Sequence, residues 1–249
     1  MSTPLTDGIN ALTQYANETT GKQDTTLSDA VGSLVEGYGQ GGINWFKKIS
    51  SLSYLFYQKE LPEPLVLDFE GNTITRNCEG TFYYCTGSKN LTIKNLNINS
   101  NYMSYMFNSS ELETITFENC SFAPTRVNRM FSCNYLKGVY GIEFDLSTVT
   151  STLDLIYFSR ALEDIRFKPN TIKGNFAVDG CIKLNAESLI SIANGLDGSV
   201  QARVSGTSAP PVRLNTIMGT NDNGTFIADP NGTLTLADFI TTVKGWTLS

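Results

Sequence analysis

Apolar and small residues recur along the middle of the chain with a period of 21 to 26 residues. Each repeat has a leucine, and a small residue stands three positions before it. The leucines are Leu91, Leu112, Leu136, Leu162 and Leu184, and the small residues are Ser88, Ser109, Cys133, Ser159 and Cys181. An aromatic residue stands five positions before the leucine in three copies, as Phe107, Phe131 and Tyr157. Such a period is typical of repeat architectures, in which each repeat is one structural unit.

The residues after each leucine alternate as in a short strand. Leu112–Phe117 and Leu162–Phe167 share the pattern Leu-Glu-x-Ile-x-Phe, and looser copies occur at Leu91–Leu96, Leu136–Val139 and Leu65–Phe69. One strand and one loop cannot bury both a leucine and an aromatic, whereas stacked copies bury them in a continuous core. We therefore expect a β-rich solenoid of irregular leucine-rich repeats with one short strand per repeat. The alternative is an antiparallel β domain with coincidental spacing.

The solenoid interpretation makes two specific expectations for the core. The five leucines form one buried ladder, and each aromatic stacks on the next. Cys133 and Cys181 alternate with serines at equivalent positions, so we expect both thiols to be buried and reduced, as small hydrophobes.

The N-terminal region has a different pattern, that of two short helices within residues 6–38. The apolar positions of the two helices are Ile9, Leu12, Tyr15, Val31, Leu34 and Tyr38. Helices this short are marginal on their own in water, so these side chains must be buried against the first repeat, sister subunits or another protein. Glycines between 37 and 42 form a break before the repeats. We divide the chain into a helical segment, 1–42, and a solenoid, 43–249; the segment is either a cap or an attachment module.

The C-terminal region, from about residue 184, has a helix and strand pattern. Asn185 can cap a helix over 186–194 that ends at Gly195, and Thr235 can cap a helix over 236–244 that ends at Gly245. Strands are expected at Val212–Leu214 and Trp246–Leu248. We expect the helices to cover the open end of the solenoid, with Trp246 in the core.

Composition and charge exclude several functions. The 249 residues include 18 Lys and Arg against 24 Asp and Glu, for a net charge of −6, so nucleic acid is a poor partner. No apolar run approaches the ~20 residues of a membrane-spanning helix. Histidine is absent, which removes Ser-His-Asp and Cys-His catalysis and His-ligated zinc. Adjacent strand residues such as Glu163 and Asp164 face opposite sides and cannot serve one substrate together, so we expect no enzymatic activity, cofactor or metal.

A binding surface is the better-supported function. The residues beside the middle apolar residue of each strand form one exposed sheet face, and solenoids bind ligands through such surfaces. The candidate ligand-binding residues are Thr114, Thr116, Tyr140, Asp164 and Arg166. Four tyrosines could stack on sugars or instead pack in the core or in loops: Tyr83, Tyr84, Tyr102 and Tyr105.

Phe107–Phe117 and Phe131–Leu136 resemble the BspA-like leucine-rich repeats of bacteria and phages, whose repeat reads approximately aromatic-x-x-Cys/Ser-x-x-Leu-x-x-Ile-x-Phe/Ile. The resemblance covers roughly residues 65–184. The repeat lengths here are irregular, and a proline at the end of the strand, as at Lys168-Pro169, is missing from most copies. The resemblance implies a fold far better than a function.

Three stretches at the N-terminus, Leu12–Gly21, Asp24–Val31 and Gly37–Gly39, are similar to a leader on phage and prophage structural proteins of Gram-positive bacteria. The ending Lys244–Leu248 resembles the terminal repeat of phage-borne members of the same repeat family. The resemblance implies a virion structural protein made in the host cytoplasm, with host-surface binding at the tail tip or on a fibre. It also implies that the helical segment, with Ile9, Leu12, Tyr15, Val31, Leu34 and Tyr38, contacts other virion proteins or sister subunits of a homo-oligomer.

Three alternatives to a tail protein stay open. A head-decoration fibre is a close variant. A bacterial cell-surface adhesin or interaction module is disfavoured because no signal peptide or wall anchor is visible in the sequence. A glycan-degrading virion enzyme is disfavoured by the missing histidine and the lack of facing carboxylates. The ligand of the binding face is a host polysaccharide or protein, and we expect neither nucleic acid nor membrane insertion.

Overall fold

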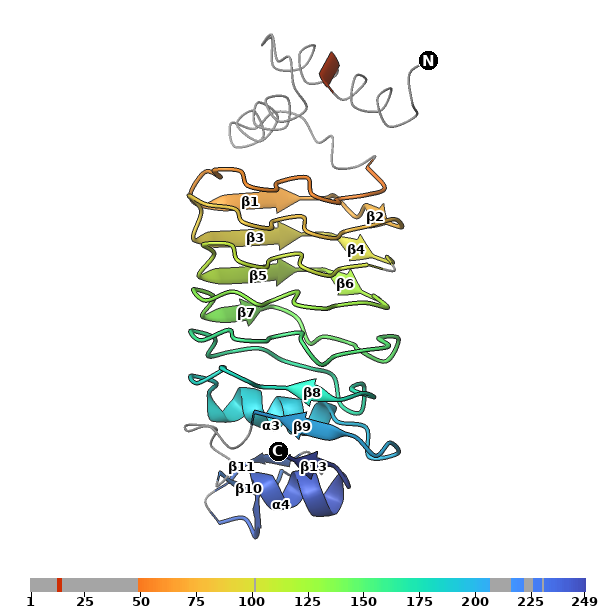
Figure 1. Cartoon of the computed structure of the whole chain (residues 1–249), viewed down its shortest axis with the longest axis vertical. Helices are drawn as coiled ribbons and strands as arrows, with labels where there is room; N and C mark the ends of the chain where they lie inside the picture. The colour runs from red at the N-terminus through yellow and green to blue at the C-terminus, as the bar shows by residue number, and fades with distance from the viewer. Residues whose placement is uncertain (1–12, 15–48, 101, 207–215, 222–225, 230) are drawn as a thin grey trace.

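The computed structural model describes residues 13–14, 49–100, 102–206, 216–221, 226–229 and 231–249 (Figure 1). Thr13 and Gln14 are helical, as predicted. The rest of the expected N-terminal helices, including the candidate interface residues Ile9, Leu12, Tyr15, Val31, Leu34 and Tyr38, lies outside the described residues. The expected strand at Val212–Leu214 lies outside them as well.

The described chain winds into a β-solenoid of about 6 turns stacked along the long axis (Figure 1). Four strands form a parallel sheet in the order β1 (Leu65–Asp68), β3 (Asn90–Lys94), β5 (Thr114–Glu118) and β7 (Gly138–Tyr140). Every neighbouring pair in this sheet is parallel. The predicted β-rich solenoid is therefore confirmed, and the alternative of an antiparallel domain is wrong.

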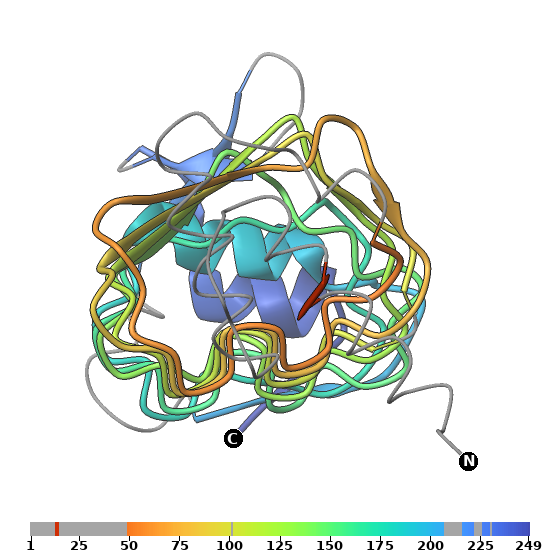
Figure 2. The same cartoon turned by 90° about the horizontal axis from the view of Figure 1, so that it is seen from above.

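Three walls enclose the core of each turn. A second parallel sheet, which the sequence did not predict, joins β2 (Thr73–Ile74), β4 (Asn97–Ile98) and β6 (Ser121–Phe122). The third wall consists of consecutive tight turns, and seen from above it forms the wavy side of the ring (Figure 2). Backbone hydrogen bonds join this wall from turn to turn, as from Phe56 N to Thr81 O at 2.8 Å and from Phe82 N to Met106 O at 2.7 Å.

Aromatic rings form the centre of the core. Phe56, Phe82, Phe107 and Phe131 stack with centroids 4.9, 5.3 and 5.5 Å apart and with ring planes within 15° of parallel. All four side chains are buried. The predicted stacking of Phe107 on Phe131 is thus confirmed, but the next position belongs to the buried Ile156, since Phe131 N bonds to Leu155 O. The expectation for Tyr157 was off by one residue, because Tyr157 lies half-buried beside that position.

The predicted leucine ladder is correct for four of its five members. The register pairs Thr114 with Gly138 and Gly138 with Asp164, which places Leu112, Leu136 and Leu162 at one repeat position. The bond from Asn185 N to Glu163 O adds Leu184 to it. Leu91 instead pairs with Ile115, three residues further along the strand. All five leucines are buried, but Leu91 belongs to the next inward position.

The small residues of the first two repeats also differ from the prediction, by three residues in one repeat and by one in the next. The buried column consists of residues whose hydroxyl or thiol bonds to a nearby wall carbonyl: Cys85, Ser110, Cys133, Ser159 and Cys181. Ser88 and Ser109 were therefore wrong choices for this position. All five cysteines are free and Cys133 and Cys181 are buried, as expected. Burial raises the pKa of the Cys181 thiol to about 12, against a weaker opposing hydrogen bond with the Ser159 backbone.

The end of the main sheet is covered by α3 (Ala186–Gly195), which begins where the sequence predicted. Asn185 is its N-cap, and its side chain accepts a hydrogen bond from Ser188 N. Two serine hydroxyls of the helix then accept the backbone N–H groups of the last sheet segment: Ser188 from Ile165 at 3.0 Å and Ser191 from Phe167 at 2.8 Å. The helix thereby satisfies a sheet edge that would otherwise be open for association.

The predicted helix over 236–244 and the strand after it are both present, although the helix is divided into two parts. Thr235 caps α4 (Leu236–Asp238) through a capping box with Asp238, and the helix continues as the π-helix η2 (Phe239–Val243). Gly245 has a φ of 70°, as a helix-terminating glycine requires. The buried Trp246 then precedes β13 (Thr247–Leu248), and its indole N–H donates to Asp197 O.

Two small sheets complete the C-terminal region. β13 pairs in parallel with β9 (Arg203–Ser205), which pairs with β8 (Phe176–Ala177). β10 (Ile217–Thr220) lies between β11 (Phe226–Ala228) and β12 (Leu234–Thr235) in an antiparallel sheet.

The phenylalanine stack generates a prediction for stability. Replacing Phe107 by Ala removes a ring that contacts both Phe82 and Phe131, and the free energy of unfolding should fall by about 3–5 kcal/mol. Chemical denaturation measures this change. The matched control is Tyr135→Ala, because Tyr135 is 61% exposed and should change the free energy by no more than about 0.5 kcal/mol. Equal effects of the two substitutions would contradict the stacked core.

Candidate functional site

The five candidate ligand-binding residues lie on the outward face of the main sheet. In β5 the side chains alternate, with Ile115 and Phe117 buried and Thr114 and Thr116 half-buried on the other face. Thr116 pairs with Tyr140 in the neighbouring strand, and Thr114 and Asp164 flank Gly138 in one row. Strand alternation therefore brings residues from three turns onto one surface, as the sequence predicted.

Asp164 and Arg166 pair with each other on this face. Arg166 Nε lies 2.8 Å from one carboxylate oxygen of Asp164, and a guanidinium NH₂ group donates to the other at 3.2 Å. The two side chains keep 22% and 31% of their surface exposed. The bidentate geometry fixes the guanidinium plane, and part of both side chains stays exposed to solvent.

Tyr140 leans back along its own strand over Gly138. Its hydroxyl lies so close to Gly138 that a Cβ there would be 2.1 Å away, so the glycine makes room for the ring. Burial, and then the charges of Asp164 and Glu163, raise the pKa of the Tyr140 phenol. The ring is 41% exposed, and its protonated hydroxyl can donate a hydrogen bond at neutral pH.

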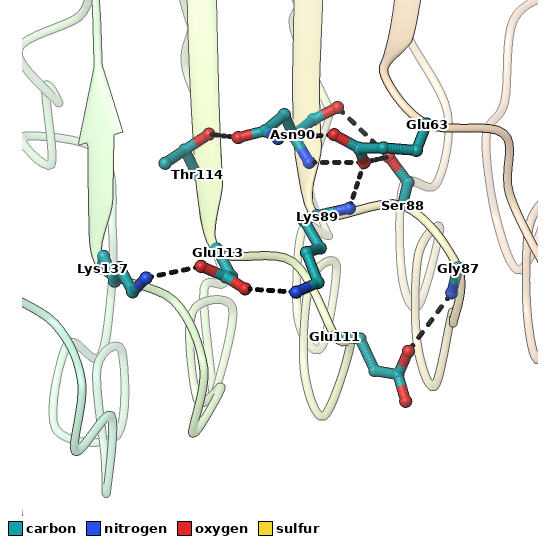
Figure 3. Close-up of polar contacts among 9 residues, drawn as sticks. All are labelled: Glu63, Gly87, Ser88, Lys89, Asn90, Glu111, Glu113, Thr114 and Lys137. Carbon is teal, nitrogen blue, oxygen red and sulfur yellow. Dashed lines mark hydrogen bonds and ion pairs between the residues drawn. The ribbon is translucent and has the colours of Figure 1, made fainter.

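A ladder of polar side chains runs along the edge where the strands begin (Figure 3). The Glu63 carboxylate accepts hydrogen bonds from the Ser88 hydroxyl, from the backbone of Lys89 and Asn90 and from the Asn90 side chain. Asn90 Oδ1 in turn accepts from the Thr114 hydroxyl at 2.7 Å. The ladder thus joins three successive turns and holds the Thr114 side chain in place.

A second ladder on the same edge is ionic (Figure 3). The Glu113 carboxylate lies between the ammonium groups of Lys89, at 3.1 Å, and Lys137. The bond to Lys137 and then that to Lys89 lower the pKa of Glu113. Exposed pairs such as these join neighbouring turns but contribute little to stability.

Sequence reasoning missed the half of the face that lies on β1 and β3. Thr92 pairs with Thr116, and Val66 pairs with Thr92, so the outward row continues over two more turns. Val66 is 40% exposed. An alignment of Leu91 with Ile115 would have found these residues, whereas the alignment of Leu91 with Leu112 placed them out of register.

The four tyrosines singled out in the sequence are not core residues. Tyr84 and Tyr102 are 46% and 38% exposed, and Tyr83 and Tyr105 are half-buried. Tyr83, Tyr84 and Tyr105 belong to the wall of turns, and Tyr102 forms an isolated bridge with Arg126 just before that wall. Tyr102 lies under the guanidinium of Arg126, 4.9 Å from its ring centroid.

Within the described part of the chain, no three His, Cys, Asp or Glu residues gather closely enough to hold a metal ion. The helices described there include none that is long and apolar enough to cross a membrane. No protein-family model matches the chain, and no curated protein or solved structure matches it either.

The Glu63 ladder generates a prediction on acid stability. Burial alone would raise the pKa of this carboxyl, but hydrogen bonds from Asn90, Lys89 and Ser88 lower it to about 2. A carboxyl with a lower pKa in the folded state stabilises the fold above its unfolded pKa of about 4.3. That contribution is lost as the pH falls from there toward 2. The free energy of unfolding should therefore fall less steeply between pH 5 and pH 2.5 in Glu63→Gln than in the wild type.

Urea denaturation at a series of pH values measures this difference. The control is Glu143→Gln, since Glu143 is exposed and no hydrogen bond or ion pair to a described residue involves its carboxylate. In the control, the free energy of unfolding should fall with pH as steeply as in the wild type. If it also falls as steeply in Glu63→Gln, the ladder does not hold the carboxylate.

Proposed function

We propose that this chain is a structural protein of a bacteriophage particle that displays its solenoid at the tail tip or on a fibre to bind the host surface. The observation that carries the proposal is the outward face of the main sheet. Its side chains come from successive turns, they are of mixed polarity, and the core does not require them. Solenoids commonly use such extended surfaces for recognition.

The chemistry of the face suits a host polysaccharide or an exposed host protein. Thr116 and Tyr140 offer hydroxyl groups and an aromatic surface beside each other. The Asp164–Arg166 pair adds a fixed donor and acceptor with part of its surface open. A ligand rich in hydroxyl or amide groups can bond to all of these without supplying a charge.

We further propose that the N-terminal segment, 1–42, attaches the protein to other virion proteins and to sister subunits of a homo-oligomer. The similarity of this segment to phage leaders supports this role. We propose that the chain acts by binding and not as an enzyme, since acids on the face are paired with cations: Asp164 with Arg166 and Glu118 with Lys94. A head-decoration fibre is the close variant of this proposal.

The location in the particle can be tested directly. Particles induced from the bacterium that carries the gene are purified, and antibody to the solenoid is located by immunogold microscopy. We expect gold at the tail. Gold on the head would favour the decoration fibre, and protein found only on the bacterial envelope would overturn the proposal in favour of an adhesin.

Attachment is tested in the same particles with the full chain. Leu12→Asp combined with Leu34→Asp should leave the melting temperature of the solenoid unchanged but abolish incorporation, because a buried unpaired carboxylate costs several kcal/mol. The control is Gln14→Asp, since Gln14 is exposed, and it should incorporate normally. A double variant that melts lower than the wild type would show that the segment is a cap, and one that still assembles would contradict attachment.

Host binding has its own measurement, with labelled full chain added to intact host cells. Replacing Thr116 and Tyr140 by Ala should raise the apparent Kd about tenfold, as expected for residues at the centre of a binding surface. Tyr135→Ala should bind as the wild type does, because this tyrosine lies outside the sheet face. Unchanged binding by the double variant would exclude the sheet face as the host-binding surface.

A further inference from the structure

Five tyrosines of the wall of turns form a continuous cluster on the solenoid surface. They are Tyr54, Tyr57, Tyr83, Tyr84 and Tyr105, and we call them the tyrosine cluster. Ring centroids lie 5.7 Å apart for Tyr54 and Tyr57, 5.6 Å for Tyr57 and Tyr83, 4.3 Å for Tyr83 and Tyr84, and 5.9 Å for Tyr83 and Tyr105. The cluster therefore crosses three successive turns parallel to the solenoid axis.

These rings are not part of the hydrophobic core. The inward positions of the same wall are filled by Phe56, Phe82 and Phe107. Tyr54, Tyr57 and Tyr84 keep 46%, 37% and 46% of their surface exposed. A contiguous exposed aromatic surface of this kind usually marks a binding site.

The backbone at three of the tyrosines is unfavourable for an aromatic residue. Tyr54, Tyr84 and Tyr105 have φ values of 52°, 58° and 58°, in the left-handed region that bulky side chains rarely adopt. The wall imposes this conformation, since Gln58, Gly80 and Ser109 share it at equivalent positions. Tyrosine is therefore a costly choice there that the core does not require, which points to a functional requirement.

Equivalent positions in neighbouring turns prove that the fold does not require tyrosine there. Tyr54 N bonds to Glu79 O and Gly80 N bonds to Ser104 O, so Gly80 occupies in its turn the position of Tyr54 and Tyr105. By the same pattern, Gln58 and Ser109 occupy the position of Tyr84. The Tyr54 ring lies over Gly80, where a Cβ would be 2.4 Å from it. The small residue thus leaves room for the ring on the surface.

The charges around the cluster select the class of ligand. The cations that lie over aromatic rings in the described chain lie over Tyr102, Tyr157, Phe158 and Phe239, all outside the cluster. Burial and then the charge of Glu79 raise the pKa of Tyr54, and Glu79 places a negative charge at one side of the cluster. Arg129 occupies the position of Tyr105 in the next turn, but its guanidinium pairs with Asp154 and lies over Tyr157. Nucleic acids and acidic glycans need available cations beside the stacking rings, so a neutral ligand fits better.

A neutral polysaccharide matches both the geometry and the chemistry. Pyranose rings present apolar C–H faces that pack on aromatic rings, and their hydroxyl groups pair with phenols, which combine an apolar ring with a polar tip. The spacing of 5.6 to 5.9 Å from turn to turn is close to the length of one sugar unit. Successive sugars of one chain can therefore lie over successive tyrosines.

We propose that the tyrosine cluster is a second binding site, separate from the sheet face, which takes a neutral polysaccharide chain along the solenoid axis. The inference rests on the proposed host-surface function and names the ligand class of an additional site. The sheet face lies across the ring from this wall (Figure 2), so the two sites can be tested independently.

The test combines binding with stability in the full chain. The probes are neutral hexasaccharides of β-linked glucose, N-acetylglucosamine, galactose and mannose, titrated by calorimetry. At least one should bind, and Tyr84→Gly combined with Tyr105→Gly should raise its Kd at least about tenfold. The melting temperature of this variant should be unchanged or higher, because glycine relieves the left-handed strain. If the tyrosines had a structural role instead, the melting temperature of the variant would fall.

A matched control uses a tyrosine outside both sites. Tyr135→Ala should bind the hexasaccharide as the wild type does. The inference is overturned if none of the hexasaccharides binds, if the Tyr84 and Tyr105 variant binds as tightly as the wild type, or if polygalacturonate competes as well as the neutral sugar. If the Tyr84→Gly and Tyr105→Gly variant no longer binds cells although no hexasaccharide binds the wild type, the cluster binds a protein partner. This result would also overturn the inference. Host-cell binding that survives in that variant would leave the sheet-face proposal intact.

Discussion

The whole structure depends on stacking each residue on its counterpart in the next turn. In the core, this places phenylalanine on phenylalanine from Phe56 to Phe131 with nearly parallel planes. In the backbone, it closes hydrogen bonds between turns in both parallel sheets and in the wall of turns. Because a single repeat can bury neither its aromatic nor its strand edges, the fold exists only as a stack.

The same stacking turns outward residues into rows. A residue type that recurs at an outward position becomes a ladder, as in the hydrogen bonds from Thr114 through Asn90 to Glu63 and in the ion pairs of Glu113. The core does not restrict these positions, so they are free to carry recognition. The sheet face and the tyrosine cluster are two such sets of rows on different walls, and each offers a ligand repeated contacts along the axis.

A stack must also be ended, since its last turn presents an open edge. Here α3 takes the place of the next strand, and the hydroxyl groups of Ser188 and Ser191 replace the backbone acceptors that a strand would supply. Beyond it, Trp246 is buried and fixed by its bond to Asp197. The C-terminal elements thereby close the core without extending the sheet face.

The sequence by itself determined the features that depend on local pattern. The period, the strand at Thr114–Glu118, the Phe107 and Phe131 pair, the Asn185 cap and the buried Trp246 follow from alternation, capping chemistry and spacing. Alternation also placed all five candidate residues, from Thr114 to Arg166, on one face.

Only the tertiary structure decided the register between turns, because repeat lengths vary and a local motif can be satisfied by chance. Ser88 and Leu91 fit the small-x-x-leucine pattern, yet Leu91 pairs with Ile115, and the residue of that turn that bonds to the wall carbonyl is Cys85. The half of the sheet face on β1 and β3 was lost with that register. The polar ladders and the tyrosine cluster likewise join residues more than 20 positions apart, and their contacts exist only once the turns are stacked.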